Sequence, residues 1–308
     1  MDMNISGHQA YFILHGFSAS QFWHWNFFVV ILVMYLLTIT GNIIIITIVL
    51  IDSLLNSPMY FFIGNLSFIE MLYTSVTIPN LLVLLTGKSK SISLSGCLTQ
   101  FFFFFSLGSA ECFLLAVMSY DRYCAICNPL LYNAIMNRSL CCYLVLACWI
   151  GGFFPNLFPT VLLSYLNFCG RYIQHFFCDL SPLLQLSCSI TNSLQTLNFL
   201  TASAIVLLSF SVTLWTYIRI IITIVAIPST TGKFKSFSTC ASHLTVVIIF
   251  FGTVAFVYVR PKASKDFELN KVLSVVYIVL TPVVNPLIYS FRNKDIKAAI
   301  KKLILNKR

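Results

Sequence analysis

Hydrophobic side chains fill seven long stretches of this chain, and polar side chains gather in the short segments between them. Each stretch fits the roughly 20 residues that an α-helix needs to cross the hydrocarbon of a bilayer. Because a backbone inside lipid must satisfy its own hydrogen bonds, runs of this length are expected to be helical. The pattern predicts seven membrane-spanning helices, over residues 23–50, 58–85, 97–125, 140–163, 195–225, 237–260 and 270–291.

The composition is that of a membrane protein. Of the 308 residues, 58% are hydrophobic and 9% are charged, whereas soluble domains carry about 25% charged residues. We therefore expect an all-α membrane protein, with an outer segment over residues 1–22, a seven-helix bundle over 23–291 and a basic amphipathic tail over 292–308. The sequence contains no Gly-rich phosphate loop, zinc-protease motif or nucleophile elbow, so we expect neither a cofactor nor an enzymatic activity.

Basic residues set the expected orientation. No Lys or Arg precedes Lys88, and 12 of the 19 lie at one set of span ends or in the C-terminal tail. Because cytoplasmic segments carry the excess of positive charge, the tail is expected in the cytoplasm. An odd number of spans then places the N-terminus outside, where Asn4 begins a glycosylation sequon. The net charge of +10 favours contact of the tail with membrane lipid, and no nucleic acid is expected as a partner.

Four of the 11 cysteines are predicted on the outer face: Cys97, Cys169, Cys178 and Cys188. The first opens span three, and the others lie in the loop over residues 164–194. An oxidising face makes disulfides the expected state, but four cysteines allow three pairings, which the spacing leaves open. The remaining cysteines are interpreted as small buried apolar residues, not as metal or redox sites.

Two carboxylates, Glu70 and Glu111, lie deep inside predicted spans, away from the span ends. At about 1.5 Å per helical residue, both lie roughly 16–18 Å from the cytoplasmic edge, with Asn42 and Asn285 expected nearby. Buried acids in a membrane usually face the bundle interior. Two like charges at one depth would share a proton or hold a cation such as sodium between them, and a neutral hydrogen-bonded pair is the structural alternative. A transporter built on these acids is a competing function, although no paired repeats of interrupted spans are visible.

Two motifs near the cytoplasmic face predict movable parts. Span three ends in Asp121-Arg122-Tyr123, where the carboxylate supplies the partner that a guanidinium at that depth needs. The motif is either a latch that opens when helices move or a simple positive-inside anchor. Span seven carries Asn285-Pro286, where proline weakens the helix, and the segment is either a functional bend or a plain kink.

Six longer stretches make the chain similar to a known family. They are GN at 41–42, PMYFF at 58–62, MSYDRYCAIC at 118–127, HFFCD at 175–179, KSFSTCASHL at 235–244 and PVVNPLIYS at 282–290. With these stretches the chain resembles the rhodopsin-like G-protein-coupled receptors, and among them the vertebrate odorant receptors, over essentially its whole length. The stretches in spans three and six are long and highly specific to odorant receptors.

The resemblance implies an odorant receptor in the plasma membrane of olfactory neuron cilia. Its partner would be a stimulatory olfactory G protein that raises cyclic AMP. The resemblance also implies two disulfides, Cys97–Cys178 and Cys169–Cys188.

A switch at the cytoplasmic side is implied as well, in which side chains rearrange when span six swings outward. Its residues would be Asp121, Arg122, Tyr123, Tyr217, His243, Asn285, Pro286 and Tyr289. By itself, His243 on an apolar helix is interpreted as a core residue and not as a metal ligand.

By family position, a ligand pocket is expected among the outer halves of spans three, five, six and seven. Phe104 stands where amine receptors carry Asp, so a protonated amine would be buried there without a partner. The expected ligand is a small, neutral, largely apolar volatile, oriented by Tyr258, Thr201 or Ser109. A receptor for a neutral ligand outside the nose would share this machinery. The expected lining is Phe104, Phe105, Gly108, Ser109, Thr201, Ile205, Phe251, Val254, Tyr258, Val275 and Ile278.

Some residues depart from the family pattern. Glu70 replaces the usual Asp in span two, which weakens the inference of a sodium site. Leu131 replaces a basic residue, and this change is expected to alter the contact with the G protein. Phe251 replaces a frequent Tyr and removes a hydroxyl from the pocket floor.

Overall fold

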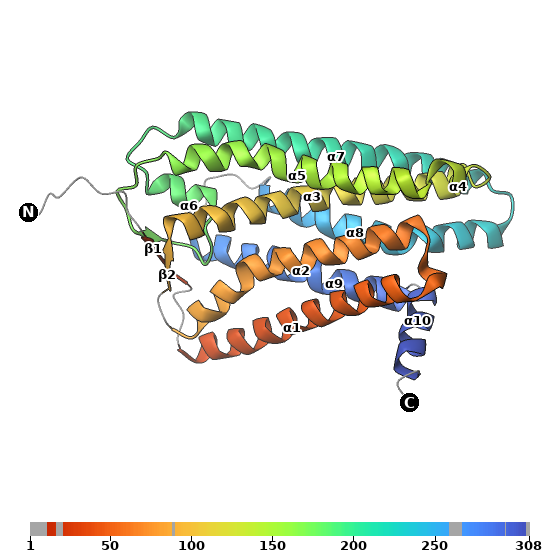
Figure 1. Cartoon of the computed structure of the whole chain (residues 1–308), viewed down its shortest axis with the longest axis horizontal. Coiled ribbons are helices and arrows are strands. Elements are labelled where there is room, and N and C mark those ends of the chain that lie inside the picture. The colour runs from red at the N-terminus through yellow and green to blue at the C-terminus, as the bar shows by residue number, and fades with distance from the viewer. Residues whose placement is uncertain (1–10, 17–20, 88–89, 259–266, 293, 306–308) are drawn as a thin grey trace, which may run out of the picture.

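The computed structural model describes residues 11–16, 21–87, 90–258, 267–292 and 294–305. Long helices lie side by side along one axis of the molecule (Figure 1), and the seven-helix bundle predicted from the sequence is confirmed. These helices are α1 Gln21–Ile51, α2 Pro58–Leu85, α3 Leu94–Cys127, α5 Arg138–Ser164, α7 Asn192–Ala226, α8 Thr230–Tyr258 and α9 Phe267–Arg292.

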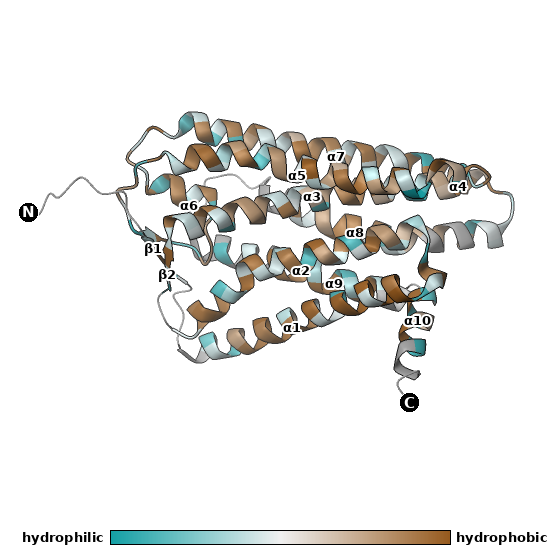
Figure 2. Ribbon diagram, viewed as in Figure 1, coloured by the Kyte–Doolittle hydropathy of each residue, from teal (hydrophilic) through white to brown (hydrophobic). Residues whose placement is uncertain are grey.

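Hydropathy explains why these helices form a membrane bundle. Among the described residues, α1, α2, α3, α5 and α7 are each long and apolar enough to cross a bilayer, while α8 and α9 contain the shorter apolar stretches Cys240–Val254 and Ile278–Tyr289. Figure 2 shows hydrophobic residues along the length of the helices, with hydrophilic residues mainly towards their ends. Large apolar side chains such as Val29 and Leu207 are exposed on the outer surface, where a bilayer would solvate them.

Short elements close the two ends of the bundle. The strands and α6 lie at one end, whereas α4 and α10 lie at the other (Figure 1). The short elements are β1 Tyr11–Leu14, β2 Lys90–Ser93, β3 Tyr172–Ile173, the 3-10 helix η1 Ser53–Leu55, α4 Tyr132–Ile135, α6 Leu180–Gln185 and α10 Lys294–Leu305.

Helix α3 is the centre of the bundle and packs against α2, α5 and α7. Its apolar side chains are buried over most of its length. At its outer end the side chain of Ser93 accepts a hydrogen bond from Gly96 N, which satisfies one of the free N–H groups at a helix start. The same device begins α5, where Asn137 Oδ1 accepts from Leu140 N.

Helix bounds extend beyond several predicted spans. Helix α8 begins at Thr230, well before residue 237, and includes the polar residues Lys233 and Lys235. A hydropathy pattern detects only the part of a helix that lies in hydrocarbon. Backbone hydrogen bonding along the helix continues beyond the hydrocarbon into the aqueous boundary.

A three-stranded sheet forms part of the outer end, where the sequence predicts only an outer segment. Strand β1 lies between β2 and β3, antiparallel to β2 and parallel to β3. Phe12 and Leu14 are buried and Tyr11 is exposed, as expected for a strand whose side chains alternate between faces. The N-terminal segment therefore contacts two distant loops.

Two disulfides hold the long outer loop. Cys97 of α3 is bonded to Cys178, and Cys169 is bonded to Cys188 within the loop. Beside the first bridge, Gln100 Nε2 donates to Val76 O at 2.7 Å, and its Oε1 accepts from Cys178 N at 3.0 Å. The loop is thereby attached to both α2 and α3.

Candidate functional site

A small cavity lies in the outer part of the bundle, where α3, α5, α7 and α8 approach one another. Its volume is about 60 Å³, far below the roughly 300–1,000 Å³ of pockets for drug-sized ligands. No charged side chain is among the described residues that line it. These are Tyr73, Phe104, Phe105, Gly108, Ser109, Cys112, Asn156, Asn198, Ala202, Ile205, Val206 and Val254.

Aromatic rings form the wall of the cavity that faces the outer loop. Phe104 stacks on Tyr73 with ring centroids 4.8 Å apart, and it also lies 4.8 Å from the ring of Phe177. Phe105 meets Phe104 edge to face at 5.2 Å. Such packing fixes the ring positions, so the cavity has a rigid apolar side below the disulfide-bonded loop.

Amide groups supply the polar side of the cavity. Asn156 Nδ2 donates to Ser109 Oγ at 3.1 Å and to Gly152 O at 2.8 Å. Ser109 Oγ in turn donates to Phe105 O at 2.8 Å. Asn198 of α7 makes no hydrogen bond through its side chain to any described residue. Its amide can therefore donate to, and accept from, a bound molecule.

A buried polar cluster lies deeper in the bundle. Asn285 Nδ2 donates to Glu70 Oε1, Asn42 lies beside the same carboxyl, and Glu111 is close enough to interact with it electrostatically. Four buried oxygens have no hydrogen-bond partner among the described residues: Asn42 Oδ1, Glu70 Oε2, Glu111 Oε1 and Asn285 Oδ1. Hard oxygen donors of this kind suit a shared proton or a hard cation such as sodium.

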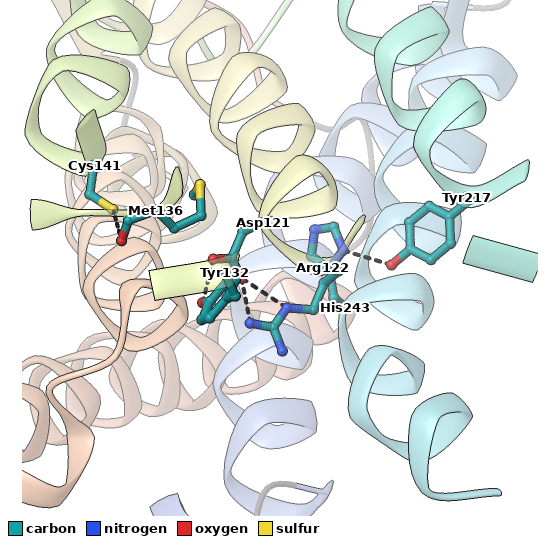
Figure 3. Close-up of polar contacts among 7 residues, drawn as sticks. All are labelled: Asp121, Arg122, Tyr132, Met136, Cys141, Tyr217 and His243. Carbon is teal, nitrogen blue, oxygen red and sulfur yellow. Dashed lines mark hydrogen bonds and ion pairs between the residues drawn. The ribbon is translucent and has the colours of Figure 1, made fainter. Parts of the chain in front are cut away.

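The ion pair near the cytoplasmic end of α3 is closed. Arg122 Nε donates to Asp121 Oδ2 at 2.9 Å, and a second guanidinium nitrogen contacts the same oxygen. Tyr132 of α4 donates from its hydroxyl to Asp121 Oδ1 at 2.7 Å. Figure 3 shows these side chains converging on Asp121. The carboxylate, buried with no exposed surface, is thus held by two partners from different elements.

A second polar pair joins α7 to α8 on the other side of Arg122. The Tyr217 hydroxyl lies 2.7 Å from His243 Nδ1, and the two rings are nearly parallel. Figure 3 shows this pair beside the guanidinium, and Arg122 interacts electrostatically with both side chains. A movement of α8 relative to α3 would therefore disturb a contact that involves all three helices.

Two further motif residues take structural positions. The Tyr123 ring packs on Trp215 of α7 with centroids 5.2 Å apart. Pro286 approaches α1 so closely that a Cβ added at Gly41 would lie 3.1 Å from Pro286 Cβ. Gly41 thus allows α1 and α9 to pack together at Pro286.

Comparison with known proteins identifies the relatives of this chain. Residues 31–307 match the family model described as olfactory receptor. The chain belongs to the olfactory receptor family. Human olfactory receptor 11L1 is 48% identical over 297 residues, covering 96% of this chain and 92% of the relative. Human olfactory receptor 6S1 is 44% identical over 304 residues, covering 98% and 92%, and rat olfactory receptor 287 is 46% identical over 297 residues, covering 96% of each.

Family membership decides the general function. The protein is a multi-pass membrane receptor for odorants that works with a G protein, and it is not an enzyme. The resemblance inferred from the motifs is confirmed. Membership also favours the receptor over the transporter hypothesis that Glu70 and Glu111 raised.

The structure brings together part of the expected pocket. Six of the predicted residues line the cavity: Phe104, Phe105, Gly108, Ser109, Ile205 and Val254. Four others do not line it: Thr201 is half-buried, and Phe251, Val275 and Ile278 are buried among the helices. Phe251 packs instead on Phe210 and Phe250. The predicted Asn4 and the side chain of Tyr258 lie outside the described residues.

Three residues of the receptor were missed by sequence reasoning. Asn156 and Asn198 line the cavity, and Tyr132 holds Asp121. An amide inside an apolar span was the available signal for Asn156. Tyr132 gave none, because its partner is known only once the short helix α4 is placed against α3. Leu131, 59% exposed, precedes that helix on the cytoplasmic surface.

Proposed function

We propose that this receptor binds a small, neutral, largely apolar volatile in the cavity between α3, α5, α7 and α8. Binding shifts the bundle to an active state, which engages a stimulatory olfactory G protein and raises cyclic AMP. The proposed setting is the plasma membrane of olfactory neuron cilia, with the basic tail against anionic lipid.

The single observation that carries this proposal is the lining of the cavity. It combines aromatic and aliphatic walls with the amides of Asn156 and Asn198. No charged side chain is among the described residues that line it. A charged ligand would lose its hydration there without gaining a partner. A neutral molecule with one oxygen, such as an alcohol, ketone or ester, would bury its carbon chain and bond to an amide.

The expected affinity is low. Burying about 200 Å² of ligand surface at roughly 25 cal/mol per Å² provides about 5 kcal/mol before the loss of ligand freedom. Binding in the micromolar to millimolar range follows. To activate the receptor, an agonist must bind the active bundle more tightly than the resting one, since only this difference in affinity shifts the equilibrium.

The hydrogen bonds around Arg122 define the resting state of the proposed switch. The guanidinium is held by Asp121, while Tyr217 is paired with His243. If α8 swings outward, His243 leaves Tyr217, and the freed hydroxyl becomes available to other partners such as Arg122. Tyr289 would join them from α9, where its buried hydroxyl has no hydrogen-bond partner among the described residues.

The pocket is tested by removing one amide. We expect Asn198→Leu to raise the concentration for half-maximal cyclic AMP response by about fivefold to tenfold for oxygen-bearing odorants, since one hydrogen bond of ~1 kcal/mol is lost. Hydrocarbon volatiles should be unaffected. Asn192→Leu, at the start of α7, is the matched control. An equal loss of potency for oxygenated and hydrocarbon ligands would show that the agonist does not bind to the Asn198 amide.

The switch is tested separately from the pocket. Arg122→Ala or Tyr217→Phe should abolish the odour-evoked rise in cyclic AMP while surface expression, measured with an N-terminal epitope, is retained. Tyr143→Phe changes an exposed tyrosine on α5 and serves as the control. A variant at Arg122 or Tyr217 that reaches the surface and signals normally contradicts the assigned roles.

A further inference from the structure

A groove unrelated to the odorant cavity lies at the cytoplasmic end of the bundle. It is bounded by the end of α1, η1 and the start of α2 on one side, and by α4 and the start of α5 on the other. Its volume is about 630 Å³. The lining residues are Val49, Leu50, Leu55, Asn56, Ser57, Pro58, Phe61, Asn133, Met136, Asn137, Arg138, Cys141 and Cys142.

The polar half of the groove is suited to an anion. Arg138 makes no ion pair with any described residue, and it is exposed at the first turn of α5. Asn56 and Asn133 are exposed beside it, with amide groups that can donate hydrogen bonds. No Asp or Glu is among the described lining residues. Asp52, which caps the start of η1, is already paired with Lys302 at 3.5 Å.

The other half of the groove is apolar. Leu55, Met136 and Cys141 are buried at its floor, where Cys141 lies against the Met136 backbone (Figure 3). Leu50 is 80% exposed and Phe61 is 38% exposed at the ends of membrane-spanning helices. These side chains would meet the acyl chains of the inner leaflet, not water. A soluble anion would use only the polar half.

We propose that this groove binds an anionic phospholipid of the cytoplasmic leaflet. The phosphate and the additional anionic group of the headgroup, such as the carboxylate of phosphatidylserine, contact Arg138 and the neighbouring amides, and one acyl chain lies over Leu50 and Phe61. The inner leaflet carries the anionic lipids, and basic pockets between helices at that depth bind their headgroups. Charge complementarity and the two-sided lining therefore point to the same occupant. Bound lipid would bridge α1 and α2 to α4, the helix whose Tyr132 holds Asp121.

Native mass spectrometry of the purified full-length receptor tests the proposal. The receptor is placed in micelles with equal amounts of phosphatidylserine and phosphatidylcholine that have the same acyl chains. We expect retention of phosphatidylserine over phosphatidylcholine in the wild type. Arg138→Gln should weaken phosphatidylserine retention about fivefold, because each basic side chain near the surface contributes about 1 kcal/mol.

The matched control is Arg219→Gln, which removes an exposed arginine from the cytoplasmic end of α7, outside the groove. Its lipid retention should equal that of the wild type. Equal retention of the two lipids by the wild type, or equal losses in the two arginine variants, would overturn the proposal. So would a hydroxylamine-labile acyl group on Cys142, since a covalent chain would then fill the groove.

A second pair of variants separates charge from folding. Asn133→Asp places a carboxylate in the groove and should reduce phosphatidylserine retention at least as far as Arg138→Gln, whereas Asn133→Gln should not. Glycerophosphoserine, which lacks acyl chains, should fail to displace the lipid. Full displacement by this soluble headgroup would show that the apolar half is not used and would refute the choice of a lipid.

Discussion

At the scale of single residues, Gly152 decides how closely α3 and α5 approach. A Cβ at this position would lie 2.6 Å from Ala110 N and 2.7 Å from Ser106 O, which are backbone atoms of α3. At the adjacent Gly151, a Cβ would meet only the ring of Phe113, at 3.3 Å. A ring can turn aside, but a helix backbone can only move as a whole. Two neighbouring glycines thus have different structural importance.

We predict that Gly152→Ala destabilises the receptor by about 1–3 kcal/mol, the usual penalty for forcing extra volume into a packed interface. Thermal unfolding of the purified protein and its surface expression report the change. Gly151→Ala is the control and should stay close to the wild type. Equal stability of the Gly152 variant and the wild type would mean that α3 and α5 are not in contact there.

At the scale of elements, α10 is held against the bundle by a hydrogen bond to a charged group, by an ion pair and by buried apolar side chains. The Tyr60 hydroxyl of α2 donates to Asp295 Oδ2 at 2.7 Å, and Tyr60 is 8% exposed. Lys302 also pairs with Asp52, but its side chain is 59% exposed. An exposed ion pair is screened by water and stabilises little. Ile296 and Ala299 of α10 are buried and complete the contact with the bundle.

Asp295→Ala should therefore loosen α10, because it removes the acceptor of a hydrogen bond to a charged group, which is worth about 1.5–3 kcal/mol. Hydrogen exchange of the backbone over residues 294–305 is expected to accelerate by more than tenfold. Lys302→Gln removes the exposed pair instead and should accelerate exchange only slightly. If the lysine variant proves the more damaging of the two, the contact between Tyr60 and Asp295 is not the stronger of these two polar contacts.

At the scale of the whole molecule, the outer end is a cap assembled from distant parts of the chain. The sheet, two disulfides and the long loop meet there, and Lys271 of α9 reaches across to donate to Gly16 O at 2.7 Å. His175 is buried in this loop between the rings of Phe176 and Phe177. Burial, with a smaller effect of the Lys271 ammonium, lowers the pKa of His175 from 6.5 to about 3.

The depressed pKa predicts a loss of stability in acid. Below about pH 6.5 the unfolded chain binds a proton at His175 that the folded receptor does not bind, so stability falls as the pH drops through that value. The apparent Tm should be lower at pH 5 than at pH 7.5. His175→Phe should reduce this difference, whereas His15→Gln, at an exposed position, should not. An unchanged pH dependence in the Phe variant would count against a neutral buried imidazole.

The sequence by itself predicted the number of membrane helices, their approximate positions and their orientation. The length of an apolar run, the placement of basic residues and the need of a backbone in lipid for its own hydrogen bonds all act locally along the chain. The pattern of residues is therefore enough to predict these helices. The stretches at 118–127 and 235–244 also indicated the family, because they are long and specific to odorant receptors. Residue reasoning left the pairing of Cys97 open, and only the resemblance implied its partner.

Only the tertiary structure decided which side chains meet. Asn156 and Asn198 line the cavity while Phe251 packs among helices, since lining depends on how far each helix is rotated about its axis. The N-terminal strand could not be predicted because its partners come from two distant loops. Arg138 likewise became part of a groove only when α1, α2 and α5 were brought together. Such relations depend on packing between separated segments, which no local pattern contains.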